Sequence, residues 1–355
     1  MKYAIKLVWI TMMIVIMGHE SMPVAYGEIR MDNIERLPEW EMKNSSLGGT
    51  LLLSDSPEMV ESDGILYQDK VEGSVRLFFY HVNASKTAKK MEVVLENKGK
   101  EVAHVNVSKF SLGGPGYAWL AVGKETQMSY FTGGAAEYQI DIPPGGVIPL
   151  AAEISATAVL PNMLINGIYD FTVDRQINVK VMMLPLFEES DTFSKTAQVL
   201  PADQWHLRGT FEGANRKLYS VDPYNPVLYR AVGITLADNV IDPYLQGIDA
   251  IDGTKVVNYG NYGVVYDIKP PGKNTRRISY YLVPLGGYYA GAIGIHHPEV
   301  NWSPLATPRG KTHFEDNKWK EFSFLGTYDS SESLSFTFSP PGASNLPVKL
   351  VILSQ

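Results

Sequence analysis

Short segments in which apolar and polar residues alternate dominate this chain, and they restrict its fold more than any other feature. Alternation with a period of two is typical of a β-strand that buries one face. Residues 177–183 and 334–339 show it clearly, and so do residues 91–96 and 103–108 on either side of a turn-forming stretch at 97–100. We therefore expect the last two segments to form a β-hairpin.

Several of the expected strands end at the same tripeptide, Pro-Pro-Gly. Residues 138–142, 266–268 and 336–338 each begin with an aromatic residue and run toward it. Proline cannot donate a backbone hydrogen bond to a sheet and glycine tolerates a positive φ, so the tripeptide is typical of a corner between strands. The chain has 31 glycines and 22 prolines, and we expect a helical turn or two only at 151–159. This pattern predicts an all-β fold.

Residues 1–27 have the pattern of an export signal. Two lysines precede an uncharged apolar run at 7–17, and Ala25 and Gly27 end the segment. A membrane-spanning helix needs about 20 apolar residues, so this run is too short to be one. We expect a cleaved signal peptide, no membrane span after cleavage, and a secreted, extracellular protein. The C-terminal residues carry no hydrophobic anchor, so we expect any association with the cell surface to be non-covalent.

The remaining chain has the length of two domains of about 150 residues each. The likeliest boundary is a polar stretch without periodicity at 187–199. We expect a loosely ordered N-terminal arm at 28–48, one antiparallel β-sandwich at 49–186 and a second at 200–355. Both sandwiches would be immunoglobulin-like or jelly-roll-like, arranged in tandem.

Composition and motifs exclude several classes of function. The chain has no cysteine, which excludes disulfides, thiolate nucleophiles and cysteine zinc sites. The net charge is −7 and basic residues are scattered, so a nucleic-acid partner is not expected. No nucleophile elbow, zinc-protease motif, phosphate loop or dinucleotide-binding pattern occurs, so we assign no catalytic residue.

Aromatic and histidine side chains gather in the second half of the chain. A tandem Asn-Tyr-Gly repeat, a glycine-rich segment and the residues after it contain Tyr259, Tyr262, Tyr288, Tyr289, His296, His297 and Trp302. Tyrosine and tryptophan offer a flat face and a hydrogen-bonding edge, which suits stacking on sugar rings. Asn and Gly are equally typical of hairpin turns, and the histidines of packed strands, so a purely structural role stays open. Tyr117 and Trp119 follow a glycine-rich loop that is ambiguous in the same way.

Acidic residues also cluster along the second half, where they are weak candidates for calcium. Asp238, Asp242, Asp249 and Asp252 lie in loop-like segments. Calcium takes six to eight oxygen ligands, which acidic loops can supply. These residues lack the alternating spacing of a calcium loop, and solvated turns explain them at least as well. We expect no other cofactor.

Several phrases of the sequence resemble an exported region of Bacillota proteins. They include residues 53–58, 63–67, 79–83, 207–211 and 339–346. In those proteins the region often accompanies a stalk-like module named after the N-terminal domain of copper amine oxidase. The resemblance implies a β-rich structural region, and the stalk module itself is not recognisable here.

Copper amine oxidation is rejected on the residues themselves. That chemistry needs a tyrosine in an Asn-Tyr-Asp/Glu setting and a His-x-His pair. Tyr259 and Tyr262 are each followed by glycine, and no residue separates His296 from His297.

These observations favour a bacterial surface or cell-envelope protein that binds or supports without catalysis. Its expected partner is cell-envelope polysaccharide or another surface protein, and its oligomeric state is open. One alternative is a secreted hydrolase, such as a glycosidase, with a dispersed acidic site in a concave pocket. Another is an architectural spacer with flat, polar surfaces.

Overall fold

The computed structural model describes residues 34, 36–133, 137–226, 228–271, 277–298, 303–316, 321–329 and 334–355. These residues form three β-sheets and three helices, so the all-β sandwich class predicted from the sequence is confirmed. The predicted signal peptide at 1–27 lies outside the described residues, as does Trp302. No described helix has both the length and the apolar character needed to cross a membrane.

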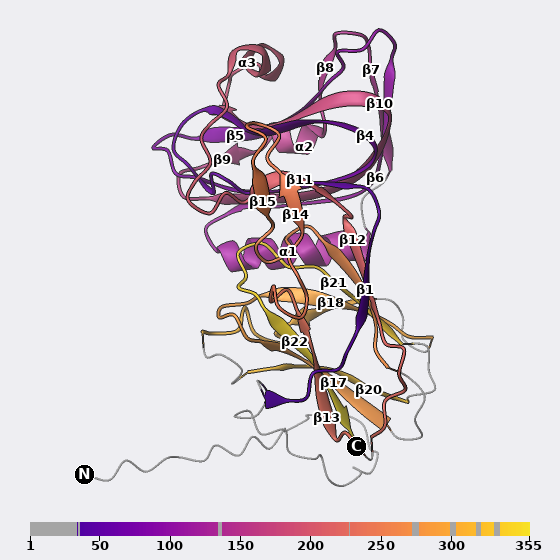
Figure 1. Cartoon of the computed structure of the whole chain (residues 1–355). Coiled ribbons are helices and arrows are strands. Elements are labelled where there is room, and N and C mark those ends of the chain that lie inside the picture. Colours follow the sequence, from indigo (N-terminus) through magenta and orange to yellow (C-terminus); the bar gives the residue numbers. More distant parts are fainter. Residues whose placement is uncertain are drawn as a thin grey trace, which may run out of the picture.

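The largest sheet has twelve strands and forms the upper part of Figure 1. Its main path runs β15-β14-β11-β2-β4-β10-β5-β8, with four shorter or branching strands attached to it. The strands are β2 (Thr50–Ser54), β3 (Met59–Val60), β4 (Gly64–Asn83), β5 (Lys89–Glu96), β6 (Ala103–Gly116), β7 (Tyr138–Ile142), β8 (Val147–Pro149), β9 (Ala158–Val159), β10 (Leu164–Pro185), β11 (Arg208–Glu212), β14 (Gln246–Ile248) and β15 (Lys255–Val257).

The long strands β4 and β10 organise this sheet. They pair antiparallel along most of their length, with an irregularity between Val173 and Ile177. On the other edge of β10, β6 pairs with the first half and β5 with the second. One buried cluster contains Val93 of β5 and Val105 of β6, so the two halves of the sheet pack against each other as a sandwich.

The hairpin predicted for residues 91–96 and 103–108 is therefore wrong. Both segments are strands, but neither pairs with the other, because each finds a longer partner in β10. The turn between them is hydrogen-bonded to another strand. The Asn97 side chain donates to the carbonyl oxygens of Glu101 and Ile142, 2.8 Å in each case, and so ties the turn to the end of β7.

Two smaller sheets form the lower part of Figure 1. The six-stranded sheet runs β1 (Lys43–Leu47), β12 (Asn215–Tyr219), β16 (Val265–Lys269), β21 (Ser335–Phe338), β18 (Gly291–His296), β19 (Pro304–Thr307). The four-stranded sheet runs β13 (Ala231–Leu236), β22 (Val348–Ser354), β17 (Arg277–Pro284), β20 (Ser323–Asp329). As expected from the recurring tripeptide, β7, β16 and β21 each end shortly before a Pro-Pro-Gly.

The sheets do not follow the boundary predicted at 187–199. Strands β11, β14 and β15 come from the second predicted segment but extend the large sheet, through the pairing of β11 with β2. In return, β1 from the predicted arm pairs with β12. The largest buried cluster contains Leu51 and Phe78 together with Phe336 and Ile352. The tandem division stays a prediction, and the described part of the arm is built into the fold.

Three helices complete the structure: α1 (Trp119–Thr132), α2 (Ala152–Ser155) and α3 (Ser190–Thr196). The turn predicted at 151–159 is confirmed by α2, and α3 lies within the predicted linker. Helix α1 was not expected. It lies between the large sheet and the two smaller ones. Its buried residues include Val122, Thr126 and Tyr130, at every fourth position. Two of these side chains carry hydroxyl groups, which weakens the apolar pattern in the sequence.

Close packing and one amide side chain hold α1 against the lower sheets. A Cβ at Gly123 would come within 1.9 Å of the carbonyl oxygen of Gly342, so only glycine fits there. The Gln127 side chain accepts a hydrogen bond from the Ala292 backbone, 2.6 Å away, and donates to the Ser339 carbonyl. These contacts place the N-terminal turn of α1 beside the loops of both lower sheets.

Candidate functional site

A cavity of about 790 Å³ opens where these parts meet. It is bounded by the turn between β2 and β3, the start of α1 and the loops that surround the lower sheets. Its lining consists of Asp55, Glu58, Tyr80, Tyr117, Ala118, Trp119, Leu120, Ala121, Leu207, Tyr262, Tyr288, Thr312, His313, Ala343, Ser344 and Asn345. Five of these are tyrosine or tryptophan, two are carboxylic acids, and none of these described lining residues is lysine or arginine.

The two carboxyl groups are held in place by a third one. Asp203 accepts hydrogen bonds from the Ser56 hydroxyl and the Glu58 backbone N–H, both at 2.9 Å. The Asp55 backbone N–H donates to the Leu207 carbonyl at 3.0 Å. The turn that carries Asp55 and Glu58 is thus pinned to the segment before β11, although the two lie about 150 residues apart in the sequence. Such pinning fixes where both carboxyl groups face the cavity.

Asp55 is buried without a compensating charge. Its side chain is only 8% exposed, and its Oδ1 atom has no hydrogen-bond partner among the described residues. Burial raises its pKa well above the usual value, and the negative charges of Glu58 and Asp203 raise it further. A buried polar atom without a partner is uncommon in a folded protein and calls for a physical explanation. Asp55 is also one of the residues that line the cavity.

Glu58 and two phenols share this electrostatic environment. Burial raises the pKa of Glu58, and Asp203 adds to the effect. Burial also raises the pKa of Tyr80 and Tyr262, and the charges of Asp55 and Glu58 raise both further. One wall of the cavity therefore combines two carboxyl groups with two neutral phenols.

The opposite walls present aromatic faces to the opening. Tyr117 is 62% exposed and Tyr288 is 46% exposed. The Trp119 ring is oriented by its indole N–H, which donates to the Asn162 carbonyl at 3.1 Å. The ring of His313 lies 6.1 Å from that of Tyr288. Exposed rings at the mouth of an acidic cavity suit a ligand with flat apolar faces and polar edges.

The structure brings two of the seven predicted aromatic and histidine candidates, Tyr262 and Tyr288, into this cavity. Tyr259 is half exposed beside Tyr244, with ring centroids 6.0 Å apart, and Tyr289 is fully buried.

The two histidines have separate surroundings. His296 is exposed and its Nε2 lies 2.8 Å from the Thr337 hydroxyl. His297 is buried against Tyr328, with ring centroids 5.1 Å apart. Neither lines the cavity.

Sequence reasoning did not select the residues at the heart of the site. Asp55 and Glu58 occur singly in a turn, and Tyr80 sits in a continuous run of β-formers, so nothing marks them locally. Tyr117 and Trp119 did carry a signal, the glycine-rich loop before them. The others become neighbours only through the pairing of β2 with both β4 and β11.

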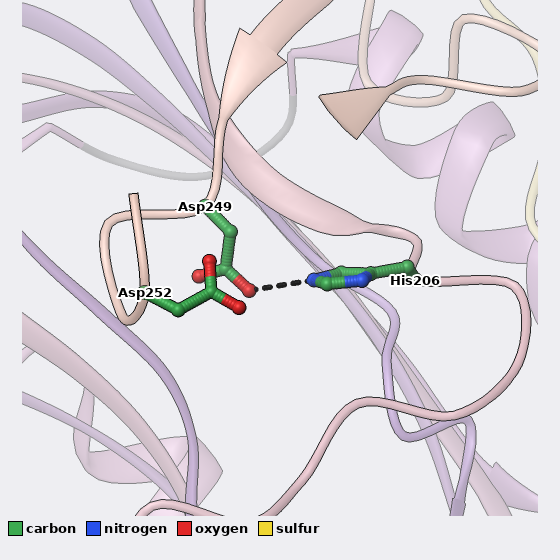
Figure 2. A group of neighbouring side chains, drawn as sticks. All are labelled: His206, Asp249 and Asp252. Atoms are coloured by element: carbon green, nitrogen blue, oxygen red, sulfur yellow. Dashed lines mark hydrogen bonds and ion pairs between the residues drawn. The ribbon is translucent and has the colours of Figure 1, made fainter. Parts of the chain in front are cut away.

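A second acidic group contains two of the predicted calcium candidates (Figure 2). Ligand atoms of His206, Asp249 and Asp252 lie within 4.8 Å of one another. Asp249 is fully buried and accepts hydrogen bonds from His206 Nε2 and Arg208 Nε, each at 2.8 Å. Asp252 is exposed, and hydrogen bonds from the Thr254 hydroxyl and backbone lower its pKa. A guanidinium already neutralises Asp249, so this donor set does not fit a calcium ion.

The other two calcium candidates lie in a separate loop. Asp242 is buried, pairs with Arg216, and accepts from the Tyr266 hydroxyl at 2.7 Å. Asp238 accepts from the backbone N–H groups of Val240 and Ile241 at 3.0 and 2.9 Å. The four residues thus form two structural arrangements, in which protein donors occupy the carboxylates.

Comparison with protein-family models and with curated proteins gives no match. Among solved structures, a Paenibacillus xanthan lyase is 9% identical with a TM-score of 0.17, over 91% of this chain and 26% of that one. The chain therefore spans about a quarter of the length of that enzyme. A 7S globulin of Momordica charantia is 10% identical with a TM-score of 0.13, over 81% of this chain and 78% of that one. TM-scores this low carry no argument about function.

Proposed function

We propose that this protein is an exported glycan-binding protein of the bacterial cell surface, and that the cavity beside α1 is its binding site. The observation that carries the proposal is the combination of five aromatic side chains and two carboxyl groups around about 790 Å³. The export signal expected at residues 1–27 supplies the proposed location.

The chemistry of sugars explains the combination. The C–H faces of a pyranose ring stack on aromatic rings, here Tyr117, Trp119 and Tyr288. Its hydroxyl groups donate hydrogen bonds to carboxylates, here Asp55 and Glu58. A cavity of this size holds two or three sugar rings, since binding pockets of about 300–1,000 Å³ take drug-sized ligands. The architectural alternative predicts flat, polar surfaces, and an aromatic cavity counts against it.

A pull-down of the chain that follows residue 27 on purified bacterial cell wall and insoluble glycans tests the proposal. We expect saturable binding that Trp119→Ala and Tyr288→Ala each weaken about tenfold, a loss of about 1.4 kcal/mol, because each variant removes an aromatic face on which a sugar ring stacks. Tyr259→Ala is the matched control, since Tyr259 is equally exposed but lies outside the cavity. Binding that all three variants retain would place the site elsewhere, and no binding at all would reject a glycan partner.

Glycoside hydrolysis is a second candidate, favoured by the raised pKa values of Asp55 and Glu58. A carboxyl group with a raised pKa is suited to act as a general acid, and a second carboxyl group can activate water or attack. Incubation with the bound glycan and assay of new reducing ends distinguishes the two functions. Release that Asp55→Asn and Glu58→Gln both abolish would establish hydrolysis, whereas retention of intact glycan supports binding alone.

A further inference from the structure

We infer that the acidic wall of this cavity selects glycans that carry a free amine, whose ammonium group pairs with Asp55. The inference rests on the proposed glycan-binding function and adds the ligand class. It starts from Asp55, a residue that lines the cavity and whose buried Oδ1 atom has no hydrogen-bond partner among the described residues.

The two charged side chains that act on Asp55 are both acidic. Glu58 comes from the same turn and Asp203 from the segment before β11. Tyr80 of β4 and Tyr262 of the loop before β16 contribute neutral phenols. Three carboxyl groups thus meet with no lysine or arginine among the described lining residues.

The nearest basic side chains are engaged elsewhere. Arg208 donates to Asp249 and to the carbonyls of Leu66 and Leu200. His81 lies behind the turn, between Ser54 Oγ and the Pro57 carbonyl, 2.9 Å from each. Burial lowers its pKa to about 4, so it is neutral at physiological pH.

Of two further basic groups, His313 lines the cavity and Lys124 does not. The Nε2 atom of His313 lies 3.5 Å from Glu315. Lys124 of α1 donates to the carbonyls of Pro308, Lys311 and Thr312, at 3.3, 3.2 and 3.4 Å.

An ammonium group would supply the acidic wall with both a positive charge and hydrogen-bond donors. It brings a positive charge to a group of three carboxyl groups, and its N–H groups can donate to the Asp55 carboxyl, whose Oδ1 atom has no partner among the described residues. Aromatic rings at the same site attract cations through their faces. A neutral hydroxyl would supply one donor and no charge, and an acetylated amine would supply one donor and added bulk.

Calorimetric titration of the chain that follows residue 27 with two matched oligosaccharides tests the inference. The probes are a glucosamine trimer and its fully N-acetylated counterpart, at mildly acidic pH, where the sugar amine is protonated. We expect the free amine to bind about tenfold more tightly, a difference of about 1.4 kcal/mol. Asp55→Asn should abolish this preference, and an unchanged circular-dichroism spectrum and urea unfolding curve would show that the variant is folded. Glu61→Gln, an exposed neighbour outside the cavity, should leave the preference intact.

Each other outcome has a definite meaning. Equal binding of both trimers, or a preference that Asp55→Asn retains, overturns the amine inference and leaves glycan binding standing. A simple alkylamine that binds as tightly as the amino sugar overturns the inference too, since the sugar would then be irrelevant. Absence of binding by either trimer overturns the inference together with the proposed function.

Discussion

Two buried carboxyl groups of this protein, Asp55 and Asp249, lie in opposite surroundings. Asp249 is fully buried but accepts hydrogen bonds from Arg208 and His206 at 2.8 Å. Asp55 is nearly as buried, but its neighbours Glu58 and Asp203 are also acidic and its Oδ1 has no partner in the described part of the chain. The protein itself supplies hydrogen-bond donors to Asp249, whereas Asp55 lines a cavity.

The difference supports the proposal that the ligand site is at the Asp55 cluster and not at the Asp249 cluster. A buried ion pair with satisfied hydrogen bonds holds segments together and leaves nothing for a ligand to add. A buried carboxyl group without a partner costs stability, and a ligand that pairs with it recovers that cost. Proximity of His206, Asp249 and Asp252 alone resembles a metal site, but the neighbouring guanidinium gives it a structural role.

The largest effect is expected from removing the partner of Asp249. Arg208→Ala leaves a fully buried carboxylate and the carbonyls of Leu66 and Leu200 without their donor. We expect the free energy of unfolding in urea to fall by about 3–5 kcal/mol, as for other broken buried pairs. Arg175→Ala, which breaks an exposed pair with Glu101, is the control and should cost about 1 kcal/mol or less. A similar small cost for both would show that the Asp249 cluster is not structural.

A second effect comes from His81, directly behind the Asp55 turn. Burial lowers its pKa from 6.5 to about 4, so the unfolded chain takes up a proton before the native state does. Its contribution to stability is complete above pH 6.5 and is lost as the pH falls through about 4, by up to about 3 kcal/mol. In His81→Gln, urea unfolding between these pH values should show a correspondingly smaller loss. His104→Gln, at an exposed histidine, should keep the wild-type slope; an unchanged slope in His81→Gln would refute the assignment.

The same substitution at two aspartates should have opposite signs. Because burial raises the pKa of Asp55, its contribution is fully present below the unfolded value of 3.8 and is lost as the pH rises through the raised value. Asp55→Asn should therefore increase the free energy of unfolding at neutral pH by about 1 kcal/mol, the lower end of the cost of an unpaired buried polar group. The increase should disappear in acid. Asp242→Asn, which weakens a buried pair with Arg216, should destabilise instead, and stabilisation by both changes would contradict the comparison.

The smallest effect is expected from calcium. Arg208 and His206 already hold Asp249, so millimolar calcium or a chelator should leave the melting temperature unchanged, as followed by circular dichroism. A calcium-dependent rise that Asp252→Asn removes would show instead that this cluster binds the ion.

Local patterns predicted the elements better than their partners. Alternation located the strands at 91–96 and 103–108, but β10 was long enough to pair with both and the hairpin did not form. Helix α1 was missed because Thr126 and Gln127 occupy its buried face. Thr126 donates to the Val122 carbonyl within the helix, whereas Gln127 is satisfied by the distant Ala292 and Ser339, which no local pattern reveals.

The residues predicted for a site also fall into two groups, those that line the cavity and those that do not. Tyr262 and Tyr288 were predicted as part of a site and do line the cavity, whereas Tyr289 is buried and Tyr259 lies outside it. A side chain's own type and neighbours indicate that it can bind, but not whether it reaches a cavity.

The all-β class follows from local sequence patterns, because strand periodicity and proline-glycine corners act over a few residues. The sequence also excludes disulfides and thiolate chemistry, since cysteine is absent. The tertiary structure, in contrast, places Asp55 and Glu58 in one cavity with five aromatic side chains. Burial and Asp203 raise the pKa of both carboxyl groups, and the pairing of β2 with β11 brings the segment of Asp203 and Leu207 to them from a distant part of the chain. Burial and long-range pairing are properties of the whole fold, and a short stretch of sequence does not contain them.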